Sequence, residues 1–301
     1  MLSRGYFLCY NLIRIIRPGA RAARGKEKNM ADGAFTDDGI TATFIHCRAG
    51  HSGAGCANGW QRWPFPTFIW TRRGHAETTY RRAELGTVDR PEGSVAYIRE
   101  NETRRSSVAT PEGADYFLAV YAFTRRGAEA LNRFALPTSL PPATQAEMRE
   151  CLRELEAAET APPWLRDAVR RKTGYSLLTL LLRNAAERPG ADAEWERLES
   201  AVQYLNTHYR EPFDLAALLR ETPYSRGHFY RLFRARFRQG PQEYASGLRV
   251  REAARLLLTT TAGVGEIGRA VGWDDPYLFS RMFKRHTGVS PLRYRRAPGG
   301  K

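Results

Sequence analysis

Two stretches near the C-terminal end decide the fold of that region, because they repeat each other. The first reads HFYRLFR at residues 228–234 and is followed by GPQEY at 240–244. The second reads LFSRMFK at 278–284 and is followed by SPLRY at 290–294. A constant offset of 50 residues pairs Phe229 with Phe279, Arg231 with Arg281, Phe233 with Phe283, Pro241 with Pro291 and Tyr244 with Tyr294. A period this long indicates a duplicated supersecondary unit.

Each copy has the pattern of two short helices joined by a tight turn. Apolar residues recur at helical spacing in both copies, at Phe229, Leu232 and Phe233 and at Phe279, Met282 and Phe283. The opposite face of each helix is basic, which is typical of a helix-turn-helix unit. Asp214, Ser225 and Asp275 are predicted N-caps of the short helices.

A long helix is predicted between the two copies, from Gln242 to Leu258. Such a connector would fix the separation of the two units. Successive major-groove faces on one side of B-DNA lie about 34 Å apart. We therefore expect one chain to fill two adjacent major grooves.

Position along each recognition helix separates predicted base contacts from predicted phosphate contacts. The N-terminal end of such a helix reaches base edges. The base-reading candidates are Arg226, Gly227, Tyr230 and Arg231 in the first unit and Pro276, Tyr277, Ser280 and Arg281 in the second. Arg234, Lys284 and Arg285 lie farther along and are predicted to bind phosphate. A solvated helix face is the alternative for any single Arg, but the basic face recurs in both copies.

Charge is concentrated around the repeat. The 301 residues carry a net charge of +15, and residues 203–301 alone hold 18 basic and 8 acidic residues, a net charge of +10. A basic domain of this kind favours a polyanionic partner, nucleic acid first.

The repeat belongs to a longer and highly specific pattern. Its strongest part comprises Arg249, Ala253, Leu256-Leu257, Glu266-Ile267, Val271-Gly272-Trp273, Asp275-Pro276-Tyr277, Phe279-Ser280-Arg281, Phe283-Lys284, Gly288-Val289-Ser290-Pro291 and Tyr294-Arg295. On these residues, the region 195–296 resembles the DNA-binding domain of AraC-type transcription regulators. The resemblance covers about a third of the chain, and it implies binding to double-stranded DNA.

The first unit departs from the family pattern at three positions. Leu219 stands where a small Ala is usual, Pro223 where the turn usually has Gly, and Arg238 where Gly is usual before the Pro-Tyr segment. We therefore expect the second unit to be the more regular reader.

The N-terminal region has the alternation of short β-strands. The predicted strands are 40–46, 66–71, 76–85, 94–98, 103–108 and 116–123, with turns at Gly74, Pro91-Glu92-Gly93 and Pro111-Glu112-Gly113. Many short strands at regular spacing indicate a barrel or sandwich. The dense aromatic residues of this region either line a ligand pocket or form an ordinary core.

The strand rhythm and the PEGS turn at 91–94 resemble the cupin-type sensor domain often attached to this family. Metal-binding cupins carry a tight His-x-His and Glu cluster that is not found in this region. We expect no metal and no other cofactor. The patch from His46 to Cys56 fits no common zinc pattern and is predicted to be a Gly-rich loop with incidental Cys and His.

The sequence thus predicts an α+β protein with four segments. Residues 1–30 form a disordered or artefactual leader, with an export signal as the less favoured reading. A cupin-like β-barrel sensor domain spans 31–135, and the tandem helix-turn-helix domain spans 191–301. Between them, residues 136–190 form a linker with helices that either pack on the barrel or pair with a second subunit. Four scattered cysteines fit a reducing compartment. No apolar run is long enough to cross a membrane.

The favoured function is a sequence-specific transcription regulator of the AraC type that is not an enzyme, and the family resemblance favours an activator. Its expected partners are promoter or operator DNA, RNA polymerase and a small-molecule effector, for which a sugar is the usual family guess. Effector-binding residues stay unassigned, a homodimer is a further expectation, and the expected place is the cytoplasm at the nucleoid. Two alternatives remain: a cupin-type enzyme, or a DNA-repair enzyme that uses the helix-turn-helix domain for targeting.

Overall fold

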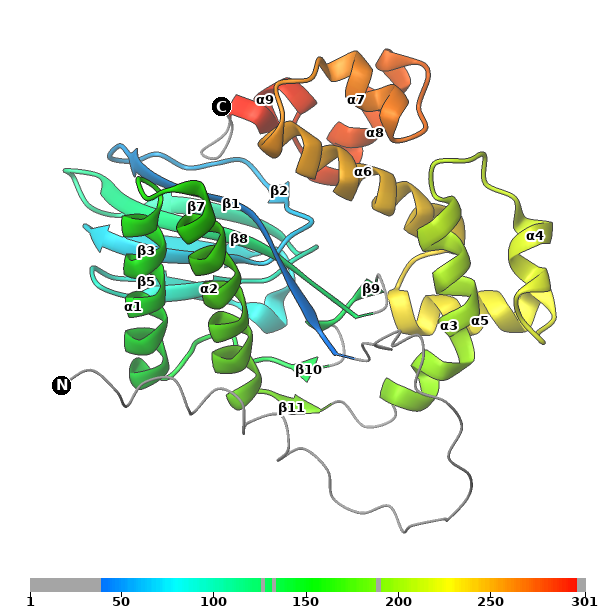
Figure 1. Cartoon of the computed structure of the whole chain (residues 1–301), viewed down its shortest axis with the longest axis horizontal. Coiled ribbons are helices and arrows are strands. Elements are labelled where there is room, and N and C mark those ends of the chain that lie inside the picture. Colours follow the sequence, from blue (N-terminus) through cyan, green and yellow to red (C-terminus); the bar gives the residue numbers. More distant parts are fainter. Residues whose placement is uncertain (1–38, 126–127, 132–133, 188–190, 297–301) are drawn as a thin grey trace, which may run out of the picture. The chain divides into compact units, whose positions relative to one another are not determined.

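Strands of the N-terminal region form a first antiparallel sheet (Figure 1). The computed structural model describes residues 39–125, 128–131, 134–187 and 191–296. The predicted leader at 1–30 lies outside these residues. The first sheet has the strand order β1 (Thr41–Ser52), β8 (Ala114–Arg125), β3 (Thr67–Arg73) and β6 (Val95–Ile98), and β9 (Ala128–Glu129) pairs with β8.

A second antiparallel sheet has the order β2 (Gln61–Arg62), β7 (Thr103–Val108), β4 (Ala76–Tyr80) and β5 (Thr87–Arg90). The α+β class is confirmed, but the predicted barrel is wrong. Among the described strands, β6 pairs only with β3 and β5 pairs only with β4, so the two sheets do not join into one ring. Closure requires each edge strand to pair, and no strand pairing joins these two edges.

Strand β1 is longer than predicted, and this corrects the view of 46–56 as a loop. Its residues 46–52 pair with β8 in regular register. Gly50 allows this pairing, because a Cβ there would lie 2.6 Å from the Tyr116 hydroxyl oxygen. Most of the patch is therefore strand.

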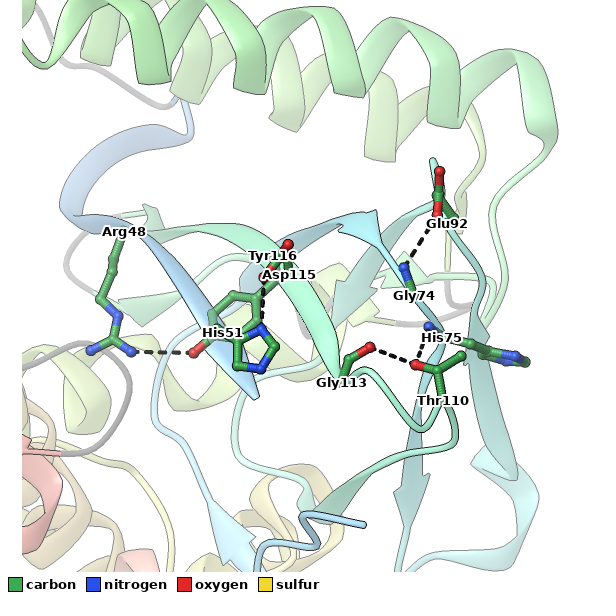
Figure 2. Close-up of polar contacts among 9 residues, drawn as sticks. All are labelled: Arg48, His51, Gly74, His75, Glu92, Thr110, Gly113, Asp115 and Tyr116. Carbon is green, nitrogen blue, oxygen red and sulfur yellow. Dashed lines mark hydrogen bonds and ion pairs between the residues drawn. The ribbon is translucent and has the colours of Figure 1, made fainter. Parts of the chain in front are cut away.

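Turns at one end of the two sheets are tied together by polar contacts (Figure 2). The Gly74 amide donates to Glu92 Oε2 at 3.2 Å, and the His75 amide donates to Thr110 Oγ1 at 3.2 Å. Thr110 Oγ1 in turn donates to the Gly113 carbonyl at 2.5 Å. Gly74 has φ 77°, and a Cβ there would clash with the Gly113 carbonyl oxygen. The predicted turns at 91–93 and 111–113 are confirmed and meet through these contacts.

Two helices, α1 (Pro142–Ala158) and α2 (Pro163–Arg183), lie side by side over the first sheet (Figure 1). Their fully buried side chains pack against β8, so β8 is buried on both of its faces. Close approach of α2 depends on Gly174, because a Cβ there would lie 2.7 Å from the Tyr121 ring. Two short strands, β10 (Phe134–Ala135) and β11 (Ala186–Glu187), pair beside these helices.

The C-terminal region is helical, as predicted. Its helices are α3 (Ala191–His208), α4 (Leu215–Arg220), α5 (Arg226–Phe237), α6 (Pro241–Thr259), α7 (Val264–Ala270), α8 (Pro276–Thr287) and α9 (Pro291–Arg296). No helix in the described ranges combines the length and apolarity that crossing a membrane requires.

The long helix α6 serves both repeated units, which confirms the predicted connector. Tyr244 and Ala245 on its first turns join the core of α3, α4 and α5 around Phe229 and Phe233. The second half of α6 contributes to a separate core around Phe279 and Phe283. In Figure 1 this helix runs from α5 to α7. One rigid element therefore connects the two units.

The core of the second unit also includes side chains from the first sheet. Ile45, Leu118 and Val120 belong to the same buried cluster as Phe283. The Trp63 and Tyr294 rings lie 4.6 Å apart between centroids. The second unit is thus packed directly against the β-sheet region.

Candidate nucleic-acid interface

Side-chain caps fix where two of the short helices begin. Asp214 Oδ1 accepts the Ala217 amide at 3.0 Å at the start of α4. Asp275 Oδ1 accepts the Tyr277 amide at 2.8 Å at the start of α8, with Pro276 in the first turn. Ser225 occupies the N-cap position of α5, but its side chain makes no capping hydrogen bond. Two of the three predicted caps are confirmed, and the third is confirmed in position only.

The first recognition helix, α5, buries its aromatic face and leaves its basic face open. Phe229 and Phe233 are fully buried. The predicted contact residues Arg226, Gly227, Arg231 and Arg234 are exposed, and Tyr230 is half-buried. A Cβ at Gly227 would meet nothing within 4 Å. The open side of α5 therefore carries all five of the residues predicted for it.

The second recognition helix, α8, repeats this arrangement. Phe279 and Phe283 are fully buried. The predicted contact residues Pro276, Tyr277, Arg281, Lys284 and Arg285 are exposed and Ser280 is half-buried. Tyr277 is 85% exposed, so its whole ring is available for contact with a ligand.

Electrostatics on both helices favour an anion. Neither α5 nor α8 contains Asp or Glu. The guanidinium carbons of Arg226 and Arg234 lie 5.9 and 5.8 Å from the Tyr230 ring centroid, so this ring holds two cations in place. Such helices offer several donors to phosphate oxygens and base edges.

Arg231 and Arg281, which occupy the same position in the two copies of the repeat, differ in their surroundings. Arg231 Nη2 lies 2.9 Å from His228 Nδ1, which can accept its hydrogen bond when that nitrogen is unprotonated. Arg281 has no hydrogen-bonding partner among the described residues. Arg281 therefore meets a ligand without first losing an internal contact, whereas Arg231 must give one up.

The two units differ in backbone conformation at positions where the first unit departs from the AraC-type pattern. Gly288 ends α8 with φ 84°, and Arg238 ends α5 at the matching position with φ 55°. In the turn of the second unit, Gly272 has φ 91°, and a Cβ there would meet the Arg210 carbonyl. No residue from 221 to 225, all of them described, has a positive φ. The repeat offset places Thr222, rather than Pro223, opposite Gly272.

Arg249 on α6 has a positioning role that the sequence reasoning missed. Its guanidinium donates to the main-chain carbonyls of Tyr209 and Glu211, which precede α4, and to that of Gly272 in the second turn at 2.7 Å. It also lies over the Trp273 ring at 5.3 Å. One side chain thus ties both units to their shared helix. The signal in the sequence that could have pointed to this role is the position of Arg249 as the first residue of the AraC-type pattern.

Burial shifts the pKa values of two side chains in the part of the 46–56 patch that lies on β1. Burial lowers the pKa of His46 to about 4. Burial together with neighbouring Glu159 raises the pKa of the Cys47 thiol to about 12. A metal-binding Cys must lose its proton. Elsewhere, His75, Glu77 and Asp89 bring their ligand atoms within 4.8 Å on the second sheet. His75 Nε2 and Asp89 Oδ1 already form a hydrogen bond there. The absence of a metal stays a prediction.

Comparison with known proteins identifies the helical region. A family model described as a helix-turn-helix domain matches residues 218–297. The lactose operon transcription activator of Staphylococcus xylosus is 33% identical over 100 residues, which are 33% of this chain and 36% of that protein. The C-terminal region of this chain is an AraC-type DNA-binding domain. The chain matches only about a third of the length of this activator, through the AraC-type domain.

Other similarities extend beyond the AraC-type domain. An uncharacterized HTH-type transcriptional regulator of Bacillus subtilis, YisR, is 28% identical over 287 residues, covering 77% of this chain and 94% of that protein. Unsaturated fatty acid-bound ToxT of Vibrio cholerae superposes with a TM-score of 0.53 at 12% identity, over 85% of this chain and 93% of that chain. This likeness shows that the sheet region and the AraC-type domain share their fold with ToxT. The Staphylococcus and Bacillus relatives are both named as transcription regulators. The AraC-type domain is a DNA-binding unit rather than a catalytic one, which agrees with the prediction for this region.

Proposed function

We propose that this protein is a sequence-specific transcription regulator that places α5 and α8 in two adjacent major grooves of its operator. The supporting observation is the duplication of an acid-free, basic recognition face on two units that share α6. Adjacent grooves require a fixed separation of the two helices, which a shared rigid helix provides.

Each predicted contact residue has a role in this proposal. Base edges are read by the N-terminal parts of the helices, through Arg226, Gly227, Tyr230 and Arg231 on α5 and through Pro276, Tyr277, Ser280 and Arg281 on α8. Gly227 has no side chain to contact a base, and its role is to let the backbone of α5 approach the DNA closely. Arg234, Lys284 and Arg285 neutralise phosphates and fix the register.

The two helices contribute unequally. Arg281 is free to form a bidentate pair with guanine, which discriminates by about 1–3 kcal/mol against a wrong base. Arg231 starts from its contact with His228 at 2.9 Å. The second unit, with glycine in its turn and at its helix end, is the more regular reader.

The β-sheet region is the proposed sensor. A cavity of about 440 Å³ lies between its two sheets and is lined by strands of both. ToxT was solved with an unsaturated fatty acid bound, and the Staphylococcus relative is named for a lactose operon. A small-molecule effector fits both precedents, and a sugar is one candidate.

Trp164 and Tyr175 of α2 are exposed and suit a homodimer contact. The protein would act in the cytoplasm at the nucleoid and recruit RNA polymerase.

Footprinting on the DNA upstream of its own gene and of adjacent genes tests the proposal. We expect a protected site that is lost in the Arg231→Ala/Arg281→Ala double variant. Arg153→Ala is the matched control, because Arg153 lies on α1, outside both recognition helices, and contacts Glu150 of the same helix and the Trp70 ring. The absence of any protected site, or equal loss in the control, would contradict the proposal.

A further inference from the structure

The cavity between the two sheets contains two buried arginines. Arg90 on β5 is 6% exposed and Arg104 on β7 is 8% exposed. Both strands pair with β4, where Arg90 stands beside Ala76 and Arg104 beside Tyr80. Both guanidinium groups therefore lie on the inner face of the second sheet, and both side chains line the cavity.

Neither buried arginine has a carboxylate partner among the described residues. Within the described ranges, Arg90 Nε and Arg104 Nη1 are buried without any hydrogen bond. The one hydrogen bond that Arg90 makes to a described residue runs from Nη2 to the Glu77 carbonyl at a long 3.5 Å. The hydroxyl of Thr71, in the same cavity, is also buried without a partner. A buried charge that lacks a counter-ion is costly, so proteins retain one where it serves a function.

The electrostatic surroundings strengthen this observation. Burial, with a further contribution from the Arg104 charge, lowers the pKa of Arg90 to about 10. Burial also lowers the pKa of Arg104. At neutral pH Arg90 stays protonated, and so does Arg104, because an arginine in a protein is effectively always charged. The cavity thus holds two positive charges and at least three unused donors.

We propose that this cavity binds a small organic anion, a carboxylate or a phosphate monoester, through Arg90 and Arg104. The planar guanidinium fork matches both groups, and charge-assisted hydrogen bonds are stronger than neutral ones. Ile69, Leu118 and Val120 line the same space and provide an apolar wall for the body of the molecule. This inference rests on the proposed sensor function and replaces a neutral sugar by an acidic ligand.

A chain of packed rings connects Arg104 to the second recognition helix. The Arg104 guanidinium lies 5.8 Å from the Trp63 ring, and Trp63 lies 4.6 Å from Tyr294 of α9. Tyr294 packs edge-on against Phe283 of α8 at 5.2 Å. An anion that draws Arg104 toward itself changes the packing under α8. Effector and DNA affinity should therefore be linked, and linkage is reciprocal.

Thermal unfolding of the full chain with matched neutral and charged probes tests the inference. The probes are glucose, glucuronate, glucose 6-phosphate and inorganic phosphate at millimolar concentrations. We expect the charged probes to raise the melting temperature and glucose to leave it unchanged. The carboxylate and phosphate arms show which acid the site prefers.

Two variants separate a ligand site from a structural role. Arg104→Met should weaken the anion response about tenfold to a hundredfold, since a charge-assisted bond is lost. Without ligand, the same variant should melt higher than the wild type, because an uncompensated buried charge is gone. Arg73→Met, at an exposed position of β3 outside the cavity, should leave both quantities unchanged.

Three results would overturn the inference: no response to any anion, an equal response to glucose and its charged analogues, or an undiminished response in an Arg90→Met/Arg104→Met variant. Footprinting on the same preparations keeps the two proposals apart. A protein that binds its operator but ignores anions refutes only this inference. A protein that binds no operator refutes the proposed function itself.

Discussion

Arg238 holds a backbone conformation that favours glycine, and replacing it should stabilise the protein. It ends α5 with φ 55° and ψ 17°, in the left-handed region. This conformation costs a residue with a side chain about 1–2 kcal/mol. The extra freedom of glycine in the unfolded chain offsets about 0.4–1 kcal/mol of the gain. Arg238→Gly should therefore raise the free energy of unfolding by about 0.5–1 kcal/mol.

Thermal unfolding measures this change. With an unfolding entropy of about 2.1 cal/mol/K per residue, a cooperative unit of about 260 residues should melt about 1–2 °C higher. Arg238→Ala is the matched control, because it removes the charge and keeps the strain. It should give no comparable gain. Gly288→Ala is the reverse change and should destabilise, since its Cβ would lie 2.6 Å from the Trp60 carbonyl oxygen. An unchanged or lower melting temperature for Arg238→Gly would refute the reasoning.

Three further predictions concern DNA affinity and pH. In gel-shift titrations on one operator, Arg281→Ala should weaken specific binding by about 1–3 kcal/mol. Arg231→Ala should weaken it less, and the reverse order would show that the two units are wrongly ranked. Lys284→Ala should reduce the slope of log affinity against log salt by about one and weaken all sequences alike, whereas an unchanged slope would exclude a phosphate contact. Glu100 is buried with both oxygens unpartnered, and burial, with repulsion from Glu129, raises its pKa well above 4.5. Because the folded state holds this proton more tightly, the stability that Glu100 contributes is lost as pH rises from about 4.5. Glu100→Gln should therefore melt higher than the wild type at pH 8, by a margin that shrinks toward pH 4.5 in parallel melts. A constant margin would contradict this origin.

The helical region was predictable because its signals are local. The Phe-x-x-x-Phe spacing in both copies fixes which helix face is buried, and the basic residues then fall outside. The Asp-Pro start of α8 marks its first turn in the sequence itself. The departure at Arg238 was visible as a missing glycine, and the structure adds its left-handed conformation.

The parts that sequence reasoning missed depend on contacts between distant residues. Strand β1 extends to Ser52 because β8, more than 60 residues away, pairs with it. Barrel closure likewise depends on which edge strands pair, and the spacing of strands along the sequence does not determine that pairing. Arg249 makes its contacts with main-chain carbonyls up to 40 residues away. Alternation in 103–108 showed a strand, but only the packed sheets show that Arg104 points inward.

The pairing of two recognition helices with two adjacent grooves is the central claim, and methylation protection of guanine N7 tests it most directly. We predict two protected major-groove segments whose centres are about 10 base pairs apart, on one face of the DNA. Arg231→Ala should remove protection from one segment, and Arg281→Ala from the other. A single protected segment, or loss of the same guanines in both variants, would contradict the account.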